Sequence, residues 1–587
     1  MTKSRIFLGI ALSTSFVTLG HAQSEQGRLS GASKDGTIGI TTPARMMVRG
    51  PRSGDSQPAT TLSAPTEREP SANAVKEELE AEIADQQRQI EQLRSALEEQ
   101  KKLLERTLRA GADESTSASP MQVSGRNEVA TAMVPSSPAT SAMSSAPQEK
   151  TAVEEVSPLQ LRIGSAFITP VGFMDFTSVY RSHDGGSGIG TNFAGIPYGN
   201  VMGNNLSEFR FSMQNSRIGF RVDAMVKGAH VIGYMESDFL GNNPGNVAVS
   251  SNSNTLRSRL YWIDAQKGKW EVLGGQTWSL ITPGRSGISP LPGNLFFTQN
   301  IDVNYQLGLV WGRIPELRFV FHPSNKAALA VALDSPEQYV GGSAGGGLVT
   351  FPAALNAYPG GELNSGGNTL AIPNVAPDVI VKLALDPSSK FHVEVGGLER
   401  QFKVWNPNTG VTFSKTGGGG FLNLNVQLFK GFRVLTNNFW SDGGGRYIFG
   451  QAPDLIARAN GSISPIHTGS TVSGFEYTHK NTLLYSYYGG LYVQRNVTVD
   501  ANGTTPIGYG YVGSPPGQNR AVQQITFGTS QNFWRDAKYG ALTLMSQYSY
   551  LVRNPWFIAA GAPRNANLNM VFLNLRYTLP GSAPAIK

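Results

Sequence analysis

The chain of 587 residues is longer than an ordinary compact domain, and its segments differ sharply in composition. It contains 67 Gly, 28 Phe, 19 Tyr and 8 Trp but no Cys, which excludes disulfide frameworks and thiolate metal sites. The formal charge of +7 is small for this length and the chain has no dense basic run, so we expect no nucleic-acid partner.

A secretory signal peptide is predicted over residues 1–22. Two basic residues, Lys3 and Arg5, precede an apolar run over residues 6–19, and small residues surround the predicted cleavage point. A membrane-spanning helix needs about 20 apolar residues, and this run is shorter. We therefore expect the mature protein to be exported without a helical anchor.

Three segments of different composition follow the signal peptide. Residues 23–70 are rich in Ser, Gly, Thr and Pro and predict a disordered spacer. Residues 71–109 carry apolar residues at alternating steps of four and three, the heptad pattern of a coiled coil. A coiled coil requires partner helices, so this segment predicts an oligomer of unspecified size. Residues 110–157 return to Ala, Ser, Thr, Pro and Met and predict a flexible linker.

Residues 158–587 predict an all-β domain, a sixteen-stranded antiparallel transmembrane β-barrel. Side chains of a strand alternate between two faces, and the clearest run sets Leu422 and Leu424 against Asn423 and Asn425. Seven short connections, each with a lysine, alternate with eight long connections rich in Gly, Asn, Ser and Pro. Short turns at one rim and long loops at the other are typical of outer-membrane barrels. An even number of strands places both ends of the barrel on the short-turn, periplasmic side.

A water-soluble barrel is the main structural alternative. Polar side chains such as Asn423 would then be buried without partners, at a cost of about 1–3 kcal/mol each. They fit a wet interior, and the apolar faces then meet lipid, where a closed barrel leaves no unpaired edge. Sixteen strands enclose an aqueous channel. Aromatic residues near strand ends are expected to form interfacial girdles, namely Trp262, Trp270, Phe533, Trp534 and Tyr577.

The stretch 206–240 predicts a hairpin whose charged face borders the lumen. Phe209 and Phe211 occupy odd positions, whereas Ile218 and Phe220 occupy even positions. A β-bulge near Asn215 would keep all four on the lipid side. The same bulge would bring three arginines together in the lumen, which are Arg210, Arg217 and Arg221. On the strand over 256–265 we expect a second alternation, with Arg257, Arg259 and Tyr261 opposite Leu256, Leu260 and Trp262.

Five strings in the barrel region carry a resemblance to a known family. They are VGFMDFTSVYR (171–181), SRIGFRVDA (216–224), GYMESDF (233–239), LRSRLYWIDA (256–265) and GGQTWSLITP (274–283). In this order, behind a predicted coiled coil, they resemble the DcaP-like porins, trimeric outer-membrane channels associated with dicarboxylic acid uptake. The resemblance implies a homotrimer with a periplasmic coiled coil, in which each protomer is its own pore for small anions. The segment 580–587 departs from the common pattern, in which the last strand ends the chain with an aromatic residue.

The residues expected to select solutes are charged side chains on the lumen face. The basic candidates are Arg210, Arg217, Arg221, Arg257, Arg259 and Lys382. Arginine suits carboxylates because its planar fork donates two parallel hydrogen bonds. The acidic candidates Glu236 and Asp238 lie on the strand next to Arg217 and Arg221. Opposed charges either create a field across the lumen or neutralise each other as salt bridges in the wall, and the sequence leaves both open.

The long connection over 281–307, with Arg285, is a further candidate for the constriction. Its Gly and Pro content predicts a compact loop, and the sequence does not say whether that loop enters the barrel.

The function predicted from these features is passive transport and not catalysis. His183 and Asp184 lie in a glycine-rich loop without a second anchored partner, and no two His are spaced for a metal site, so we expect no enzyme activity and no cofactor. The main prediction is an outer-membrane porin that passes small anions, with outer-membrane lipid and its own copies as partners. Two alternatives stay open: a less selective or sugar-specific porin, and a barrel that anchors a periplasmic tether or adhesin.

Overall fold

The computed structural model describes residue 91 and residues 159–580, without 242–253, 296–297, 343–345, 366–371 and 374–375. The predicted signal peptide, spacer and linker therefore lie outside the described residues, and so does the predicted coiled coil except for Glu91. The predicted barrel region is described from residue 159 onward, with the gaps given above. Among the described residues, no helix is both long and apolar enough to cross a membrane.

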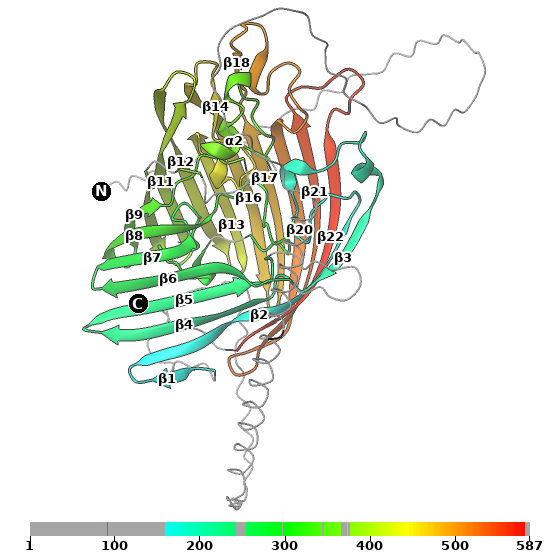
Figure 1. The fold of residues 1–587 in the computed structure, drawn as a ribbon. Helices are drawn as coiled ribbons and strands as arrows, with labels where there is room; N and C mark the ends of the chain where they lie inside the picture. The colour runs from blue at the N-terminus through cyan, green and yellow to red at the C-terminus, as the bar shows by residue number, and fades with distance from the viewer. Residues whose placement is uncertain are drawn as a thin grey trace, which may run out of the picture. The chain divides into compact units, whose positions relative to one another are not determined.

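One antiparallel sheet forms the wall of a closed barrel (Figure 1). Its wall strands are β2 (Ala166–Arg181), β3 (Glu208–Ser212), β4 (Arg217–Val226), β5 (Ala229–Asp238), β6 (Arg257–Lys267), β7 (Trp270–Trp278), β8 (Arg313–Ser324), β9 (Ala327–Asp334), β10 (Asp378–Ser388), β11 (Phe391–Asn406), β12 (Val411–Phe429), β13 (Phe432–Asp442), β16 (His467–His479), β17 (Thr482–Val493), β20 (Asn519–Asp536), β21 (Gly540–Pro555) and β22 (Ala566–Thr578). The 18-stranded sheet also includes the short β1 (Leu161–Ile163), which pairs with the start of β2. Without β1, and with β3 and β4 counted as segments of one strand, sixteen strands form the wall, as predicted.

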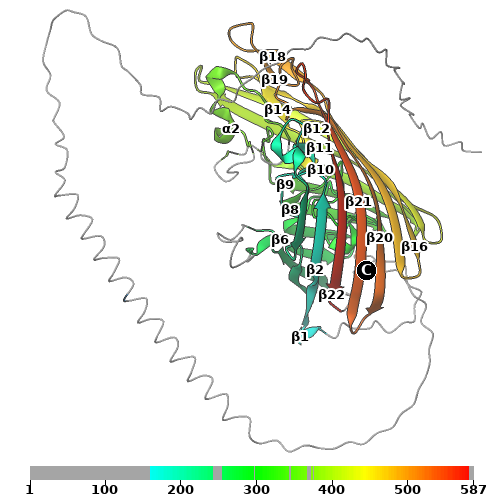
Figure 2. The ribbon, with the colours of Figure 1, turned by 90° about the vertical axis from the view of Figure 1, so that its right-hand side faces the viewer.

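The barrel closes where its first and last strands meet. Phe173 of β2 pairs with Thr578 of β22, and the register continues to Arg181 opposite Met570. Figure 2 shows β20, β21, β22 and β2 side by side along this seam. Every wall strand therefore has a hydrogen-bonded neighbour on both sides, and no unpaired edge faces outward.

The connections at the two rims differ as the sequence predicts. Seven hairpins close one rim, and in the first of them Lys227 and Gly228 both have positive φ, at 49° and 78°, as a type I′ turn requires. The long connections carry short elements at the opposite end (Figures 1 and 2). These are η1 (Phe193–Gly195), η2 (Met202–Asn205), η4 (Ala353–Leu355), α2 (Tyr358–Gly361), η6 (Gly445–Tyr447), β14 (Leu455–Ala457), β15 (Ile463–Pro465), β18 (Asn496–Val499) and β19 (Pro506–Tyr509). The short element η3 (Pro292–Asn294) belongs to the connection between β7 and β8, which enters the barrel.

The inner face of the wall is polar and its outer face is apolar. On β12, Leu422 is exposed outward, whereas Asn423 and Asn425 are buried on the inner face. Asn423 is bonded on both sides: its amide nitrogen donates to Glu394 at 2.7 Å, and its oxygen accepts from Asn437 at 2.6 Å. Asn423 thus shows how inward polar groups bond to one another across neighbouring strands, while the apolar outer belt fits contact with lipid.

The predicted bulge near Asn215 is confirmed by the register of β2. Phe173 pairs with Arg217 and Thr177 pairs with Ser212. Three residues of β2 therefore lie opposite the four residues 213–216, which is one extra residue. The extra residue reverses the side-chain parity, so Phe211 and Ile218 are both exposed on the outer face.

A second bulge, in β6, overturns part of the expected alternation. Ser237 pairs with Ser258 but Glu236 pairs with Leu260, so Arg259 is the extra residue. Beyond it Tyr261 turns outward, while Leu260 and Trp262 turn inward. The prediction that Leu260 and Trp262 face lipid was wrong.

Aromatic side chains gather on the outer face at the short-turn rim. Trp270 lies 4.7 Å from Phe321, and Phe429 lies 4.7 Å from Phe432, measured between ring centroids. Phe533 and Trp534 are exposed at the same rim, as the girdle prediction requires. Trp262 is the exception, because it is only 3% exposed and stacks on Tyr234 inside the barrel.

Candidate solute pathway

The connection between β7 and β8, residues 279–312, folds into the barrel and is called the inner loop below. Its residues Leu280, Ile281, Leu307 and Val310 are fully buried. At Gly308, a Cβ would lie 2.5 Å from the carbonyl oxygen of Thr471, so the loop backbone packs directly against the wall at β16. The sequence left open whether this loop enters the barrel, and the structure places it inside the lumen.

Backbone N–H groups of the inner loop are held by inward side chains of strands far along the chain. Five of these bonds run from Gly284 to Glu394 (3.0 Å), Gln299 to Tyr487 (3.0 Å), Ile301 to Gln547 (2.6 Å), Leu307 to Gln524 (2.8 Å) and Val310 to Asn437 (3.1 Å). The acceptors belong to β11, β17, β21, β20 and β13. A loop bonded to so many strands narrows the lumen and has little freedom to leave it.

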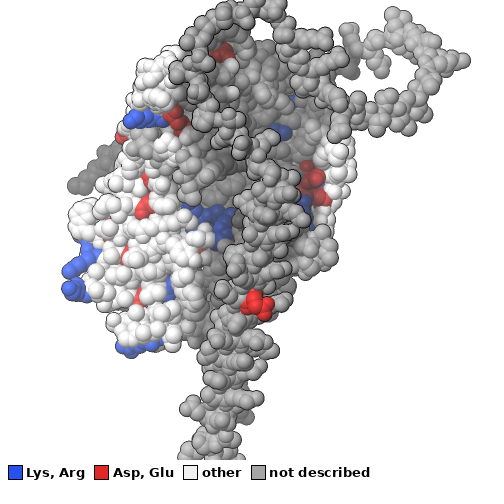
Figure 3. Space-filling model, viewed as in Figure 1, with Lys and Arg blue, Asp and Glu red and all other residues white. Residues whose placement is uncertain are grey.

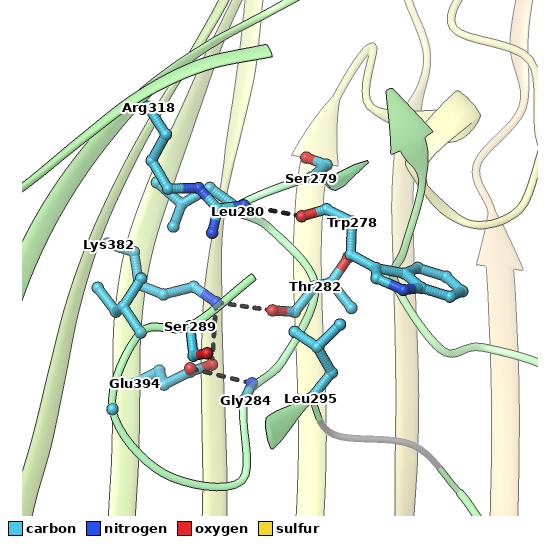
Figure 4. A pocket seen from close by; sticks show the side chains of 12 residues that line it. Trp278, Ser279, Leu280, Thr282, Gly284, Ser289, Leu295, Arg318, Lys382 and Glu394 are labelled. Atoms are coloured by element: carbon cyan, nitrogen blue, oxygen red, sulfur yellow. Dashed lines mark hydrogen bonds and ion pairs between the residues drawn. The ribbon is translucent and has the colours of Figure 1, made fainter. Parts of the chain in front are cut away.

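The start of the inner loop closes against β10 and β11. Lys382 donates to the carbonyl oxygen of Thr282 at 2.7 Å and pairs with Glu394 at 3.2 Å, as Figure 4 shows. Arg318 donates to the carbonyl oxygen of Trp278 at 2.8 Å in the same view. The cavity between these residues measures only about 10 Å³, about enough for one water molecule. This side of the loop is therefore closed by packed side chains.

A cluster of charged side chains on β4, β5 and β6 forms what we call the arginine wall. It consists of Arg217, Arg257, Arg259, Glu236 and Asp238. Arg257 pairs with Asp238 at 2.8 Å, and Arg259 bridges Glu236 at 2.8 Å and Asp238 at 2.6 Å. Arg217 lies 3.5 Å from Glu236. The bulge at Arg259 turns this side chain inward, between the two carboxylates.

Exposure in the arginine wall is unequal between cations and anions. The side chain of Arg257 is 37% exposed and that of Asp238 is 0% exposed. Arg217 is 15% exposed and Glu236 is 6% exposed. In these two pairs the guanidinium group is the more exposed partner, whereas Arg259 is only 2% exposed and is as buried as the carboxylates. Figure 3 shows Lys and Arg side chains gathered in the hollow of the molecule, beside an outer surface made mostly of uncharged residues.

The other candidates named from the sequence lie in separate pairs. Arg221 is buried against Asp223 at 2.7 Å, and Arg210 is partly exposed beside Glu208 at 2.8 Å. Arg285 forms a two-point contact with Glu476 of β16, at 2.8 and 3.0 Å. Lys382 is the buried cation of the closed junction described above. Only Arg217, Arg257, Arg259, Glu236 and Asp238 are brought together in one cluster.

Three further arginines near the lumen were missed by the sequence reasoning. Arg313, at the first position of β8, lies 5.4 Å from the ring centroid of Trp278 and 5.3 Å from that of Trp311. Arg433 donates to Asn425 at 2.8 Å, and Arg576 donates to Asp175 at 2.9 Å. Arg576 follows the polar parity of β22 and could have been found that way, whereas the positions of β13 that share the parity of Arg433 include Leu435 and Phe439 and give no clear signal. Arg313 directly follows a long loop, where alternation gives no signal.

A second long connection, residues 443–466, also enters the barrel mouth. It is held by a buried cluster that we call the loop clamp, in which Arg400 of β11 pairs with Asp378 at 3.0 Å and with Asp454 at 2.9 Å. Tyr447, nearer the start of this connection, accepts a hydrogen bond at its carbonyl oxygen from the backbone N–H of Trp311 in the inner loop, at 3.0 Å. The two inward connections therefore contact each other and together define the narrow region.

Comparison with known proteins gives structural matches but none in sequence. No protein-family model matches the chain, and no curated protein matches it. The crystal structure of the outer membrane channel DcaP of Acinetobacter baumannii is similar with a TM-score of 0.51 and 16% identity, over 70% of this chain and 97% of that one. The fold resemblance predicted from the five strings is thus confirmed.

Other solved porins are similar at lower scores. An anion-selective porin from Comamonas acidovorans matches with a TM-score of 0.39 and 13% identity, over 70% of this chain and 99% of that one. An outer membrane protein of Vibrio cholerae, OmpT, matches with a TM-score of 0.37 and 9% identity, over 72% and 99%. At these identities the likeness concerns the fold, which is that of a porin.

Proposed function

We propose that this protein is an outer-membrane diffusion porin that passes small anionic solutes such as dicarboxylic acids. The observation that carries the proposal is the unequal exposure in the arginine wall, where Arg257 is 37% exposed and its partner Asp238 is 0% exposed. A passing solute meets the guanidinium groups of Arg257 and Arg217 first, because they are more exposed than the carboxylates with which they pair. The lining charge sets which ions enter a pore, so this lining favours anions.

Two other ion pairs at the lumen support the same preference. In the pair of Arg285 and Glu476, the side-chain exposures are 12% and 5%, and in the pair of Arg576 and Asp175 they are 13% and 0%. A guanidinium group carries five N–H donors and can bind more than one acceptor. These donors are suited to the two oxygens of a solute carboxylate.

A sugar-specific pathway is the weaker proposal for this lumen. Such a pathway would present aromatic rings to the solute, and the rings near the inner loop are Trp278, Tyr305 and Trp311. They are 1%, 8% and 5% exposed and pack against one another, with centroids 5.3 to 5.9 Å apart. They support the inner loop and offer little surface to a passing ring.

We further propose that the functional unit is a homotrimer in the outer membrane, with the coiled coil of residues 71–109 in the periplasm. The heptad pattern requires partner helices. Both ends of a sixteen-stranded wall lie at the short-turn rim, which is the periplasmic rim of such barrels.

The proposal is tested by recording the full-length protein in a planar lipid bilayer under a KCl gradient. We expect stepwise conductance and a reversal potential of the sign that chloride permeation produces. A reversal potential of the opposite sign would overturn anion preference. A correctly inserted barrel without any conductance would favour the alternative in which the barrel anchors a tether or adhesin.

A further inference from the structure

The lumen face of β13 carries an arginine close to the short-turn rim. Arg433 is the second residue of β13, which begins directly after the turn at Lys430 and Gly431. It has the parity of Leu435 and Asn437 with no register shift between them, and Asn437 accepts a hydrogen bond from the inner loop. The side chain of Arg433 therefore points into the barrel, where it is partly exposed.

Asn425 ties Arg433 to the start of the inner loop. Arg433 donates to the amide oxygen of Asn425 at 2.8 Å, and the amide nitrogen of Asn425 donates to the carbonyl oxygen of Arg285 at 3.2 Å. The guanidinium group of Arg285 is held in turn by Glu476, at 2.8 and 3.0 Å. Arg433 and Arg285 are thus fixed on the lumen face by shared partners, and we call them the rim arginines.

The rim arginines share one carboxylate. Glu476 lies directly opposite Arg433 in the register of β13 and β16, yet both of its oxygens bind Arg285, and one of them also accepts from Tyr487 at 2.9 Å. Among the residues that the structure describes, no carboxylate lies within ion-pair distance of Arg433. The gaps in the description between residues 159 and 580 contain no Asp or Glu.

The carboxylates on the adjacent part of the wall have partners of their own. Asp386 pairs with His392 at 2.9 Å, and Glu394 pairs with Lys382 at 3.2 Å. The rim arginines therefore bring two positive charges to one carboxylate, and the charge of Arg433 is the one that is left over.

We infer that Arg433 binds a carboxylate group of a passing solute, at a site separate from the arginine wall. Its guanidinium group is partly exposed inside the barrel, carries five N–H donors and donates to Asn425. The planar fork of an arginine suits the two oxygens of a carboxylate. A solute carboxylate would supply the negative charge that the cluster lacks.

The two sites lie at different heights in the barrel. In the arginine wall, Asp238 is the tenth residue of β5 after its short turn, whereas Arg433 is the second residue of β13 after its own. This difference corresponds to roughly 20 Å along the barrel axis, at about 3.3 Å per residue and a strand tilt of about 40°. A solute thus meets two cationic sites in series, which suits conduction because each site can be weak enough to release it.

The inference rests on the proposed function, because it takes the lumen as a pathway for anions. It is tested by planar-bilayer recording of the full-length protein in symmetric KCl, with all channels inserted in one direction and succinate added to one side at a time. The wild-type current is expected to fall with succinate and to saturate. Arg433→Gln is expected to weaken this block from one side about fivefold. The double variant Arg217→Ala, Arg257→Ala is expected to weaken it mainly from the other side.

Three matched variants and one further measurement keep the test interpretable. Lys326→Gln removes one charge from an exposed turn at the same rim and is expected to leave the block as in the wild type. Arg433→Lys keeps the charge and is expected to retain most of the block. Arg433→Met has a similar length without charge and replaces the Gln variant if that variant does not assemble. The reversal potential in a KCl gradient without succinate tests the proposed function separately, so the two failures are distinguishable.

Three outcomes would overturn the inference. One is a succinate block of Arg433→Gln equal to that of the wild type from both sides. Another is an equal weakening from both sides, which would indicate a displaced inner loop and not a site near one rim. The third is a wild-type current that falls with succinate without saturating, which would indicate passage without a binding site.

Discussion

The arginine wall and the loop clamp are both built from ion pairs between arginine and carboxylate, but the exposure of these groups differs between the two clusters. In the loop clamp, Arg400, Asp378 and Asp454 are all at most 1% exposed, so the cation and both anions are sealed inside protein. In the arginine wall Arg259 and both carboxylates are buried, but Arg257 is 37% exposed and Arg217 is 15% exposed. A buried pair fastens structure, whereas a pair with one exposed partner also presents its charge. We therefore expect the fully buried pairs of the loop clamp to stabilise the structure, and the arginine wall, with its exposed guanidinium group, to influence ion selectivity as well.

The largest effect is expected from removing the bulge near Asn215, because this bulge turns Arg217 of the arginine wall toward the lumen. Deletion of Gln214 removes the extra residue opposite β2 and shifts the register by one. Arg217 and Arg221 would then point to lipid and Ile218 would point to the lumen, so we expect no assembled barrel. The measurement is the heat-modifiable electrophoretic mobility of the folded barrel. Deletion of Gly561, in the connection between β21 and β22, is the control and should leave assembly intact.

A substitution in the loop clamp separates its fastening role from selectivity. Arg400→Ala leaves Asp378 and Asp454 buried without their cation, at a cost of about 3–5 kcal/mol. We expect a lower thermal midpoint and a larger, noisier conductance, because the connection over 443–466 is released from the mouth. Arg458→Ala, at an exposed position of the same connection, is the control. A quiet channel of unchanged conductance would show that the clamp does not hold the loop.

A smaller effect is expected near the start of the inner loop. Arg285→Gln removes the two-point contact with Glu476 but leaves the backbone bonds that hold the rest of the loop. We expect a loss of about 3 kcal/mol or less, with brief openings to a higher conductance in single-channel records. Records identical to those of the wild type would mean that the pair with Glu476 does not restrain the loop.

The sequence predicted the wall of this barrel better than its contents. Strand alternation and lysine-bearing turns fixed sixteen strands, and the slip between Phe211 and Ile218 revealed a bulge because both flanking runs were strongly apolar. The bulge at Arg259 was missed because it ends a polar run, Arg257-Ser258-Arg259, in which alternation carries no signal. A one-residue slip then misassigned Trp262.

The course of the inner loop could not be predicted for a different physical reason. Its N–H groups are satisfied by side chains such as Glu394, Asn437 and Gln547, which lie 110, 127 and 246 residues away in the sequence. Local patterns carry no information about such distant partners. The site residues named from the sequence were inward-facing, as expected from parity, yet parity alone does not distinguish a buried pair such as Arg221 and Asp223 from an exposed arginine such as Arg257. Their role in selectivity stays a prediction.

The most direct test of the central claim is the reversal potential of the double variant Arg217→Ala, Arg257→Ala under a KCl gradient. One unit charge about 10 Å from a permeating ion in water changes its energy by about 0.4 kcal/mol, a factor of about two in occupancy. We therefore expect anion preference to fall about fourfold, while Arg221→Ala, which removes a buried guanidinium, leaves it unchanged. A double variant with the reversal potential of the wild type would contradict the account.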